Sequence, residues 1–417
     1  MAFQVLITAA PRVKYDLTMD YRYCDFGEVI DFLRKIPGIS LSVFDGAVMN
    51  HLLKDYVERF LLDYDLVIFY AETAEARMTK QLAEMCKKIS PQTKIVVYGD
   101  ATLYIPKYFS RYPFDAVHVN GDHDLVLADY INFLQGRNNE LHGLLVNTEL
   151  GWKETQAGKL LAPESWGFPA LDALPLEEYR AFSILKGSKG LEGSVYVAKG
   201  CKYACPYCVL PRREGLVDRR RPIPPLLDYL ESNKMVFSEY QLHAGTFTED
   251  KDWVLSFCSQ VNKKAININW KCTTRVDCLD EELIEKMAVA GCKSINIGVE
   301  SLLFQASSPY NKADLLALER LSLWLQQSKV QSTAFVMIGT ADQEQSDVDF
   351  TINQLESMSY KVRPTAYTPF HKLSSFSVEE LDNMNLENWD RKSLWSENSK
   401  IEYREFHRLL LRSYEAK

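Results

Sequence analysis

The sequence contains no stretch of about 18 consecutive apolar residues, the length that a helix needs to cross a membrane. Its N-terminus lacks the basic start and the cleavage site of a signal peptide, and it is predicted to be a strand. Basic residues are not in excess, because 48 Lys and Arg face 56 Asp and Glu and the net charge is −8. This charge argues against a general affinity for nucleic acid. We therefore predict a cytoplasmic protein whose partners are neither membranes nor nucleic acids.

The composition also excludes a disordered or fibrous chain, because hydrophobic residues make up 47% and charged residues 25% of the 417 residues. This length corresponds to two or three domains. The nine cysteines stay reduced in the cytoplasm. Clustered cysteines are therefore candidates for metal binding or catalysis rather than for disulfides.

Residues 1–135 alternate short apolar runs with segments of helical period. This repetition predicts a doubly wound parallel sheet, a Rossmann-like α/β fold that binds ligands outside the carboxyl ends of its strands. Residues 136–190 lack the alternation and are predicted to be a linker with a short hairpin. The predicted strands are 5–9, 41–44, 66–70, 95–98 and 116–119.

A second alternating series occupies residues 191–372. Six parallel strands with crossover helices are too few for a complete eight-fold barrel, so the pattern predicts a partial (β/α)6 barrel. Residues 373–417 are predicted to form a short helical C-terminal tail that buries Trp389, Trp395, Phe406, Leu409 and Leu410. The predicted strands are 195–198, 240–243, 266–271, 294–299, 333–338 and 364–367.

Three cysteines, Cys201, Cys205 and Cys208, follow Gly200 in CxxxCxxC spacing, just after the first strand of the second domain. Thiolates on one short loop suit an iron-sulfur cluster, and three ligands for four irons leave one iron open to a small molecule. Zinc is an alternative, although a closed zinc site prefers four ligands and no second CxxC or His pair follows. A chance meeting of unrelated cysteines is the other alternative. Core packing is predicted for Cys258, Cys272, Cys278 and Cys292.

The triplet with an aromatic residue before its last cysteine resembles the signature of the radical S-adenosylmethionine (SAM) enzymes, as do residues 270–277, 290–301 and 336–339. The resemblance implies a [4Fe-4S] cluster held by the three cysteines, with SAM on the open iron and cleaved to methionine and a 5′-deoxyadenosyl radical. Residues 243–248 depart from the family's Gly-Gly-Glu pattern. The SAM contacts that the resemblance implies are Tyr207, Gly245, Thr246, Arg275, Glu300, Ser301, Ile338 and Gly339.

Two of these residues also have structural interpretations. Arg275 could bind the SAM carboxylate with both arms of its guanidinium, or it could form a structural ion pair with Asp277. Glu300 follows a predicted strand, a position that is also typical of a helix cap.

A doubly wound sheet before a radical SAM domain resembles the cobalamin-binding radical SAM enzymes, and residues 98–102, 119–124 and 367–370 match turns of that class. Glycine at 99 and 121 would let the backbone approach the nucleotide tail of the corrin, or these are ordinary turn glycines. The Asp-x-His-x-x-Gly motif that supplies a histidine to cobalt is absent, and His118 and His123 are expected at the surface. The implied cobalamin contacts are Ala9, Thr73, Gly99, Asp100, Ala101 and Gly121.

The cysteine segment also resembles the methylthiotransferases that modify transfer RNA. That family needs three further cysteines in the N-terminal domain, where only Cys24 and Cys86 are available. Arginines at 212, 213, 219, 220 and 221 could hold phosphates, or they could form a solvated face or contacts between domains.

The cobalamin class implies an enzyme that methylates an unactivated carbon of a small molecule and receives electrons from an external donor such as flavodoxin or ferredoxin. Alternatives are a radical rearrangement, transfer of the aminocarboxypropyl arm of SAM, or a radical SAM enzyme without cobalamin. A sensor that binds a cluster or cobalamin belongs to a different class, and it would not need the SAM-contacting residues. The identity of the substrate cannot be derived from the residues.

Overall fold

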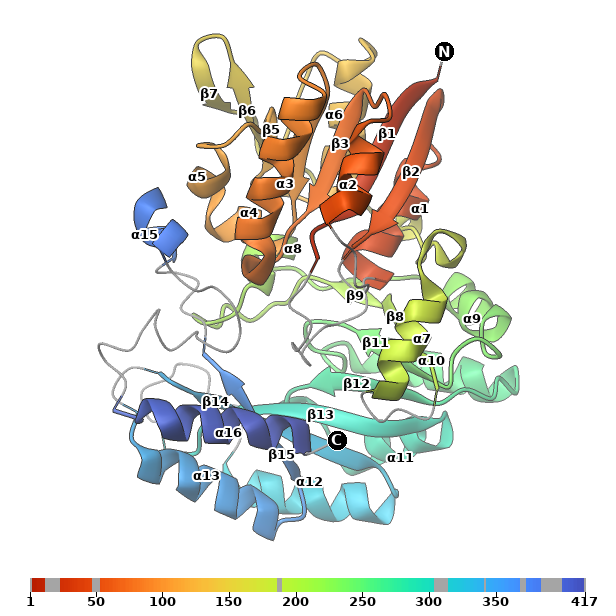
Figure 1. The fold of residues 1–417 in the computed structure, drawn as a ribbon. Coiled ribbons are helices and arrows are strands. Elements are labelled where there is room, and N and C mark those ends of the chain that lie inside the picture. The colour runs from red at the N-terminus through yellow and green to blue at the C-terminus, as the bar shows by residue number, and fades with distance from the viewer. Residues whose placement is uncertain are drawn as a thin grey trace. The chain divides into compact units, whose positions relative to one another are not determined.

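A computed structural model describes residues 2–11, 23–46, 53–185, 190–303, 314–340, 343–367, 373–383 and 400–415 (Figure 1). Trp389 and Trp395 of the predicted tail, and residues 368–370 of the predicted cobalamin match, lie outside these ranges. The chain divides into two compact units. Unit 1 comprises Met1–Phe182, Pro206–Val217 and Pro369–Asn388, and unit 2 comprises Ser183–Cys205, Asp218–Thr368 and Trp389–Lys417.

Unit 1 is built on a seven-stranded sheet of order β2-β1-β3-β4-β5-β6-β7. The pairs among β1 to β5 are parallel, and the direction of strand addition reverses between β1 and β3, as in other doubly wound folds. The strands are β1 (Phe3–Ala9), β2 (Ile39–Asp45), β3 (Leu66–Tyr70), β4 (Lys94–Tyr98), β5 (Ala116–His118), β6 (Leu144–Thr148) and β7 (Gly151–Glu154).

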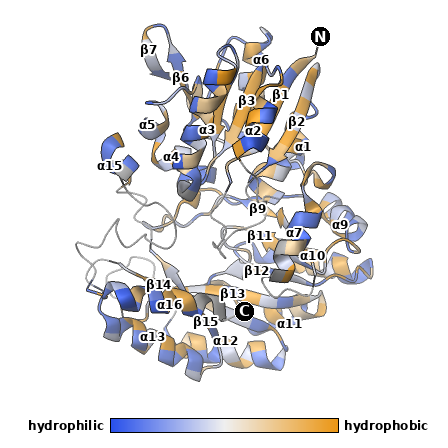
Figure 2. Cartoon of the chain, viewed as in Figure 1, coloured by the Kyte–Doolittle hydropathy of each residue, from blue (hydrophilic) through white to orange (hydrophobic). Residues whose placement is uncertain are grey.

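The central strands of this sheet are apolar because both faces are covered. Every residue of β3 is buried, and Figure 2 shows β3 as largely hydrophobic. Among the covering helices, α1 (Val29–Leu33) contacts α6 (His123–Leu134), and α2 (Leu53–Phe60) contacts α3 (Ala76–Ile89). The unit also contains η1 (Tyr23–Glu28), η2 (Thr73–Glu75), α4 (Asp100–Tyr104), α5 (Pro106–Phe109), η3 (Pro163–Ser165), η4 (Leu171–Ala173), α8 (Leu210–Glu214) and α15 (Val378–Asn383).

The segment predicted as a linker, 136–190, contains the predicted hairpin, but it is not separate from the first sheet. Strand β6 pairs antiparallel with β5, and β7 pairs with β6. The helix α7 (Leu176–Leu185) follows, and the phenol of Tyr179 donates a 2.5 Å hydrogen bond to the buried Asp45 at the end of β2. Alternating apolar residues are sparse here because most residues of β6 and β7 are half-buried or exposed.

Unit 2 contains a parallel six-stranded sheet of order β15-β14-β13-β12-β11-β8. Its strands are β8 (Glu192–Tyr196), β11 (Glu239–His243), β12 (Trp270–Thr274), β13 (Cys292–Glu300), β14 (Gln331–Ile338) and β15 (Lys361–Ala366). A two-stranded ribbon joins β9 (Ala198–Lys199) to β10 (Arg219–Arg220). The helices are α9 (Ile223–Ser232), α10 (Lys251–Lys263), η5 (Val276–Cys278), α11 (Glu281–Val289), α12 (Leu315–Gln327), α13 (Gln345–Ser357) and α16 (Tyr403–Glu415).

One strand prediction was displaced along the chain. We predicted a strand over 266–271, whereas β12 spans Trp270–Thr274. Ile266 and Ile268 are buried in the connection that precedes the strand, so their apolar character extended the predicted strand in the wrong direction. Each of the other predicted strands overlaps a strand of the structure.

No helix in the described ranges has the length and apolar character required to cross a membrane.

A short C-terminal helix, α15, is held to unit 1 through Asp382. Its carboxylate accepts hydrogen bonds from Tyr108 at 3.0 Å, from Tyr112 and from Lys80 at 3.3 Å. Burial alone would raise the pKa of Asp382, but the hydrogen bonds outweigh burial and lower it. This segment is far away in the sequence, yet it belongs to the first unit because of these contacts.

We predict that Asp382→Asn weakens this attachment by about 1 kcal/mol, because a partly exposed charged group loses its charge-assisted hydrogen bonds. Hydrogen exchange of the α15 amides should become roughly fivefold faster at pH 7. Because the pKa of Asp382 is lowered in the folded state, its carboxylate stabilises the attachment above the unfolded pKa of about 3.9. This stabilisation is lost as the pH falls through the folded-state pKa. Asp172→Asn, in the exposed pair with Arg34, is the control. Equal α15 exchange in Asp382→Asn and the parent at pH 7 would contradict the prediction.

Candidate functional site

The cysteine loop begins where β8 and β9 end, at the carboxyl edge of the second sheet. Gly200 has φ +85°, a conformation that glycine adopts without strain, and Cys201 follows it directly. Cys201 is 6% exposed, whereas Cys205 and Cys208 are half-buried. Cys201 and Cys205 belong to unit 2 and Cys208 belongs to unit 1.

Within the described residues, no three His, Cys, Asp or Glu side chains are gathered as ligands of a metal ion. The donor set nevertheless suits an iron-sulfur cluster, since all three thiols lie within eight residues of one loop. Burial raises the pKa of the Cys201 thiol, and the neighbouring Cys205 adds to this rise. The N–H of Tyr203 and the hydroxyl of Thr246 act in the opposite direction by hydrogen bonding to the sulfur. Such donors are the contacts that a metal-bound thiolate needs.

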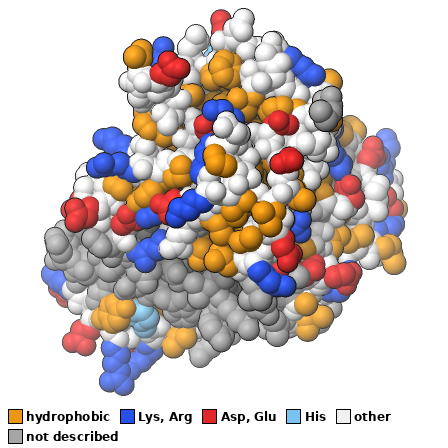
Figure 3. Space-filling model, turned by 45° about the horizontal axis from the view of Figure 1, so that its top comes forward, with side chains coloured by type: hydrophobic (Ala, Val, Ile, Leu, Met, Phe, Trp, Pro, Cys, Tyr) orange, Lys and Arg blue, Asp and Glu red, His pale blue; other side chains and the backbone are white. Residues whose placement is uncertain are grey.

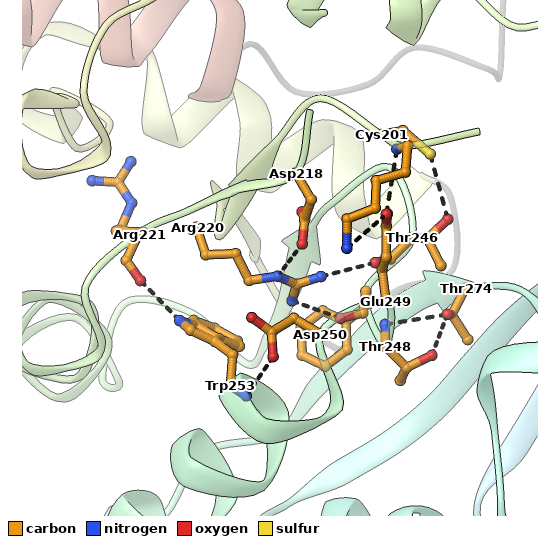
Figure 4. Close-up of polar contacts among 12 residues, drawn as sticks. Cys201, Asp218, Arg220, Arg221, Thr246, Thr248, Glu249, Asp250, Trp253 and Thr274 are labelled. Atoms are coloured by element: carbon orange, nitrogen blue, oxygen red, sulfur yellow. Dashed lines mark hydrogen bonds and ion pairs between the residues drawn. The ribbon is translucent and has the colours of Figure 1, made fainter. Parts of the chain in front are cut away.

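Thr246 lies against Cys201, with 3.8 Å between its Oγ1 and the sulfur (Figure 4). The resemblance had implied a contact of Thr246 with the methionyl amino group of SAM, and the structure gives its hydroxyl a partner in the cysteine loop. Gly245, its predicted companion, is half-buried in the same turn.

Glu249 anchors the backbone of the cysteine loop. Its carboxylate accepts the N–H of Lys202 at 3.3 Å and lies 3.6 Å from the Lys202 ammonium. The side chain of Glu249 is 4% exposed, and burial raises the pKa of its carboxyl group. The sequence analysis did not single out Glu249, although its position three residues after Thr246 could have suggested a role for it.

Arg220 fixes the turn that carries Thr246 (Figure 4). Its guanidinium donates to the carbonyl oxygens of Phe247 at 2.8 Å and Thr246 at 3.2 Å, and its Nε donates to Asp218 at 2.6 Å. The side chains of Arg220 and Asp218 are almost fully buried. The turn is therefore held by a buried ion pair and not only by strand pairing.

Tyr203 connects the cysteine loop to the residues after β12. Its ring stacks 3.9 Å from the guanidinium carbon of Arg275, and its hydroxyl lies 3.5 Å from the sulfur of Cys278. Core packing was predicted for Cys278, but this residue is half-buried and contacts the loop. Cys258, Cys272 and Cys292 are buried as predicted.

The guanidinium fork of Arg275 is occupied by Asp277. Nε donates to one carboxylate oxygen at 2.8 Å and Nη2 to the other at 2.6 Å, as in the structural ion pair that we considered. One arm, Nη2, and Nε are thus occupied, so the two-armed contact with SAM is not available. Nη1 is buried and has no hydrogen-bond partner among the described residues, so it could donate one bond to a carboxylate. The side chain of Arg275 is 8% exposed.

Glu300 ends β13 in an unusual backbone conformation. Its φ is +65°, rare for a residue other than glycine, and the β13–β14 register shifts between Gly298 and Glu300. Such strain is concentrated at functional sites, so the conformation is consistent with the SAM contact that the resemblance implies for Glu300. Ser301 follows it and is buried.

The turn after β14 contains Ile338 and Gly339, both buried. The Gly339 N–H donates to the side-chain oxygen of Gln343 at 2.8 Å, and the Gln343 amide donates to the Met337 carbonyl at 2.9 Å. The sequence analysis missed Gln343, which fixes the shape of the predicted adenine wall. Tyr207, the remaining predicted SAM contact, is half-buried and belongs to unit 1.

One face of the second sheet carries most of its polar side chains. Along β11 to β14 buried residues alternate with more exposed ones, and the buried set faces the helices that contact β13 and β14. Residues on the opposite face include Lys271, which lies 3.1 Å from Glu192 and Glu239. Arg363 pairs in register with Phe335 and lies 5.7 Å from its ring, and it forms no ion pair with any residue that the structure describes.

The residues predicted to contact cobalamin lie along the carboxyl edge of the first sheet. Ala9 ends β1, Thr73 follows β3, and Gly99, Asp100 and Ala101 follow β4. The Ala101 N–H donates to the Ala71 carbonyl at 3.1 Å, which joins the loops after β3 and β4. The fold therefore brings these predicted residues to one edge.

Close contacts inside the protein explain why glycine is present at positions 99 and 121. Gly99 has φ +115°, and a Cβ there would lie 2.5 Å from the Ala71 carbonyl oxygen. Gly121 has φ +86°, and a Cβ there would lie 2.7 Å from Gly158. The turn-glycine interpretation explains both positions, so these glycines give no independent support for a corrin.

Asp100 forms an ion pair with Arg213. The Arg213 guanidinium lies 3.3 Å from Asp100, 3.5 Å from Asp25 and 2.6 Å from Glu214. Burial raises the pKa of Asp100 to about 6, although Arg213 opposes the rise. Asp100 is therefore part of an acidic cluster around one buried arginine.

Two other arginines of the basic run, Arg220 and Arg221, also have partners inside the protein. Arg221 is buried and its Nε donates to the Tyr196 carbonyl at 2.8 Å, while Arg220 pairs with Asp218. On the face in Figure 3, basic and acidic side chains are interspersed. For Arg213, Arg220 and Arg221 these contacts match the internal roles that we considered rather than phosphate binding.

His118 and His123 are buried, so the surface positions predicted for them are wrong. Their rings lie 4.8 Å apart, and His123 also packs 5.3 Å from Tyr98. His118 Nε2 lies 3.0 Å from the Gly121 carbonyl oxygen. The prediction failed because residues 118–124 are mostly polar, although β5 and α6 place both rings in the interior.

No protein-family profile matches the chain. An uncharacterized methyltransferase of Pyrococcus horikoshii is 22% identical over 275 residues, which cover 63% of this chain and 57% of that protein. A tryptophan 2-C-methyltransferase of Streptomyces laurentii is 28% identical over 138 residues, which cover 30% of this chain and 22% of that protein. The chain thus spans little more than half of the first curated relative and less than a quarter of the second.

Two solved structures have the same fold. TsrM of Kitasatospora setae, a radical SAM methyltransferase with cobalamin and a [4Fe-4S] cluster bound, has a TM-score of 0.72 and 16% identity, over 89% of this chain and 74% of its own. OxsB, a cobalamin-dependent SAM radical enzyme with aqua-cobalamin and SAM bound, has a TM-score of 0.70 and 16% identity, over 96% of this chain and 57% of its own. The resemblance found in the motifs is confirmed at the level of the fold.

The contact between the Tyr203 ring and Arg275 gives a testable prediction. In the metal-free protein, Tyr203→Ala should expose Cys201 and raise its rate of alkylation by iodoacetamide about tenfold, because a desolvated cation–π contact contributes about 1–2 kcal/mol. Tyr203→Phe keeps the ring over Arg275 and should alter the rate less than about twofold. Peptide mass spectrometry separates Cys201 from Cys278. Equal rates in Tyr203→Ala and the parent would show that the ring does not hold the loop.

The buried histidine gives a pH-dependent prediction. Burial lowers the pKa of His118 to about 4, against an unfolded value of about 6.5. The folded state binds fewer protons below pH 6.5, so stability is present above that pH and is lost as the pH falls toward 4. The loss should reach roughly 3 kcal/mol in the opening free energy of β4 and β5 amides, measured by hydrogen exchange. His118→Gln should flatten this dependence of the opening free energy on pH. Parallel pH profiles in His118→Gln and the parent would show that His118 is not the group responsible.

Proposed function

We propose that this chain is a cobalamin-dependent radical SAM enzyme, most directly a methyltransferase that acts on an unactivated carbon of a small molecule. The observation that carries the proposal is the CxxxCxxC loop at the carboxyl edge of the second sheet, in a chain with the fold of TsrM and OxsB. The curated relatives carry methyltransferase names. Enzyme class and cofactors follow from these likenesses by analogy of fold.

We assign the finer architecture on the same grounds. The six-stranded sheet of unit 2 serves as the partial radical SAM barrel, 191–372, and the sheet of unit 1 serves as the cobalamin-binding domain, 1–135. The hairpin of 136–190 extends the first sheet, and 373–417 form the C-terminal extension.

Cys201, Cys205 and Cys208 are assigned as the residues that would hold a [4Fe-4S] cluster. With SAM, the cluster would supply radical chemistry for hydrogen abstraction from carbon, and cobalamin would supply the methyl group. The protein's own groups hold the loop in place. Lys202 is tied to Glu249, Tyr203 to Arg275, and Cys201 to Thr246. Preorganised ligands need little rearrangement when metal binds, which favours a well-defined open position for SAM.

Arg275 is assigned as a donor to the SAM carboxylate through Nη1 alone, because Asp277 occupies the other arm and Nε. Ile338 and Gly339 are assigned to the adenine and Glu300 and Ser301 to the ribose or methionyl end, in keeping with their positions at the strand ends. Tyr207 and Gly245 keep the adenine and methionyl roles that the resemblance implies.

The polar face of the second sheet is the substrate surface in this proposal. TsrM has been solved with tryptophan as its substrate, which is an amino acid with one carboxylate. Arg363, half-buried and without an ion pair among the described residues, offers a cation for such a group. An external one-electron donor, such as flavodoxin or ferredoxin, completes the proposal.

The glycine geometry of unit 1 favours keeping one second candidate, a radical SAM enzyme whose first unit binds no cobalamin. Anaerobic reconstitution with iron, sulfide and hydroxocobalamin, followed by a spectrum of the desalted protein, separates the two. Corrin bands at about one equivalent support the cobalamin enzyme. A cluster spectrum without corrin bands supports the second candidate.

The cluster assignment predicts the effect of each cysteine. Cys201→Ala, Cys205→Ala and Cys208→Ala should each lose bound [4Fe-4S] and reduce SAM cleavage below about 1% of the parent rate, because two thiols cannot hold the cluster in a defined state. Iron and sulfide analysis, the visible spectrum and release of 5′-deoxyadenosine measure the effect. Cys258→Ala, in the core of α10, is the matched control and should keep the cluster. Full cluster content in any loop variant would refute the proposal.

A further inference from the structure

The hydroxyl of Thr246 is buried next to the sulfur of Cys201. Thr246 is 3% exposed and Cys201 is 6% exposed, and 3.8 Å separate Oγ1 from Sγ. The sulfur is the hydrogen-bond partner that the structure gives this hydroxyl. Water has little access to either group, so it does not compete for or screen the hydrogen bond between them.

The turn that carries Thr246 is held from three sides. Arg220 donates to the carbonyl oxygens of Thr246 and Phe247, and the Phe247 N–H donates to the Thr273 carbonyl at 3.1 Å. The ring of Phe247 packs 5.3 Å from Trp270 and 6.2 Å from Trp253. Figure 4 shows that Arg220 reaches the turn while the Thr246 hydroxyl points toward Cys201. The position of the hydroxyl is therefore set by the fold and not by a free side-chain rotation.

The direction of this hydrogen bond depends on whether the sulfur holds metal. In the free protein either atom can donate, because the thiol carries a proton. A sulfur bound to iron has lost that proton, so only the hydroxyl of Thr246 can then donate. The arrangement thus supplies a fixed O–H donor to a thiolate.

Resting on the proposed function, we propose that Thr246 is a positioning residue that raises the reduction potential of the cluster through Cys201. Reduction adds one electron and increases the negative charge shared by the cluster and its thiolates. A donor at the sulfur stabilises that charge, and hydrogen bonds to sulfur are among the factors that set the potential of such clusters. No bond between heavy atoms forms or breaks in this step, and the electron comes from the external one-electron donor.

The test is a potentiometric titration of the reconstituted full-length protein, monitored by electron paramagnetic resonance of the reduced cluster. Thr246→Val replaces the hydroxyl by a methyl group of the same shape, and it should lower the ratio of reduced to oxidised cluster about tenfold at a fixed potential. For a one-electron couple this equals a shift of about 59 mV to more negative potential. Thr246→Ser retains the hydroxyl and should stay close to the parent potential.

Thr248→Val is the matched control. Thr248 is buried in the same turn, but its hydroxyl bonds to Thr274 at 2.5 Å rather than to sulfur. The reduction potential of the cluster in Thr248→Val should equal that of the parent. If the turn had a merely structural role, Thr246→Val and Thr248→Val would shift the potential alike. If valine at 246 prevents folding, Thr246→Ala provides the same comparison with less crowding.

The outcomes separate the two proposals. A cluster in Thr246→Val or Thr246→Ala with the parent potential would overturn the role of Thr246 while leaving the proposed function intact. A negative shift in these variants that is absent in Thr246→Ser and Thr248→Val would support it. Failure of the parent chain to bind any [4Fe-4S] cluster would overturn the proposed function and, with it, this inference.

Discussion

Parallel pairing of β8 with β11 is the constraint on which the candidate site depends. It runs in register from Glu192 with Glu239 to Tyr196 with His243, and the Val197 N–H continues the ladder to the His243 carbonyl at 2.8 Å. The carboxyl ends of both strands therefore meet at one edge. The cysteine loop leaves one strand and the Thr246 turn leaves the other, so backbone pairing brings the buried sulfur and the hydroxyl to the same edge.

Charged side chains, several of them buried, then fix what the strand pairing brings together. Arg220 with Asp218 holds the Thr246 turn, Glu249 holds the Lys202 backbone, and Arg275 with Asp277 supports the ring of Tyr203. Removing one member of such a pair leaves an uncompensated charge in a poorly solvated place, which is costly. The loop that we propose as the cluster site is in this way held by side chains of the protein itself.

The sequence was sufficient for the parts that depend on periodicity and spacing. The positions of most strands along the chain followed from apolar runs, and the position of the cysteine loop followed from CxxxCxxC. It was insufficient where the identity of a partner matters. The guanidinium of Arg275 is paired with Asp277, two residues away. Glycine is needed at position 99 because a Cβ there would collide with the Ala71 carbonyl oxygen. His118 is buried although its sequence neighbours are polar. Glu249 and Gln343 were missed because their roles depend on a turn whose shape no local pattern encodes.

The central claim, a cluster with one iron open to SAM, is tested most directly by Mössbauer spectroscopy of protein reconstituted with ⁵⁷Fe. The account predicts about four irons per chain in a [4Fe-4S] cluster, with the spectrum of a single iron site changing when SAM is added. A cluster whose iron sites all stay unchanged with saturating SAM, or a loop that holds zinc in place of iron, would contradict it.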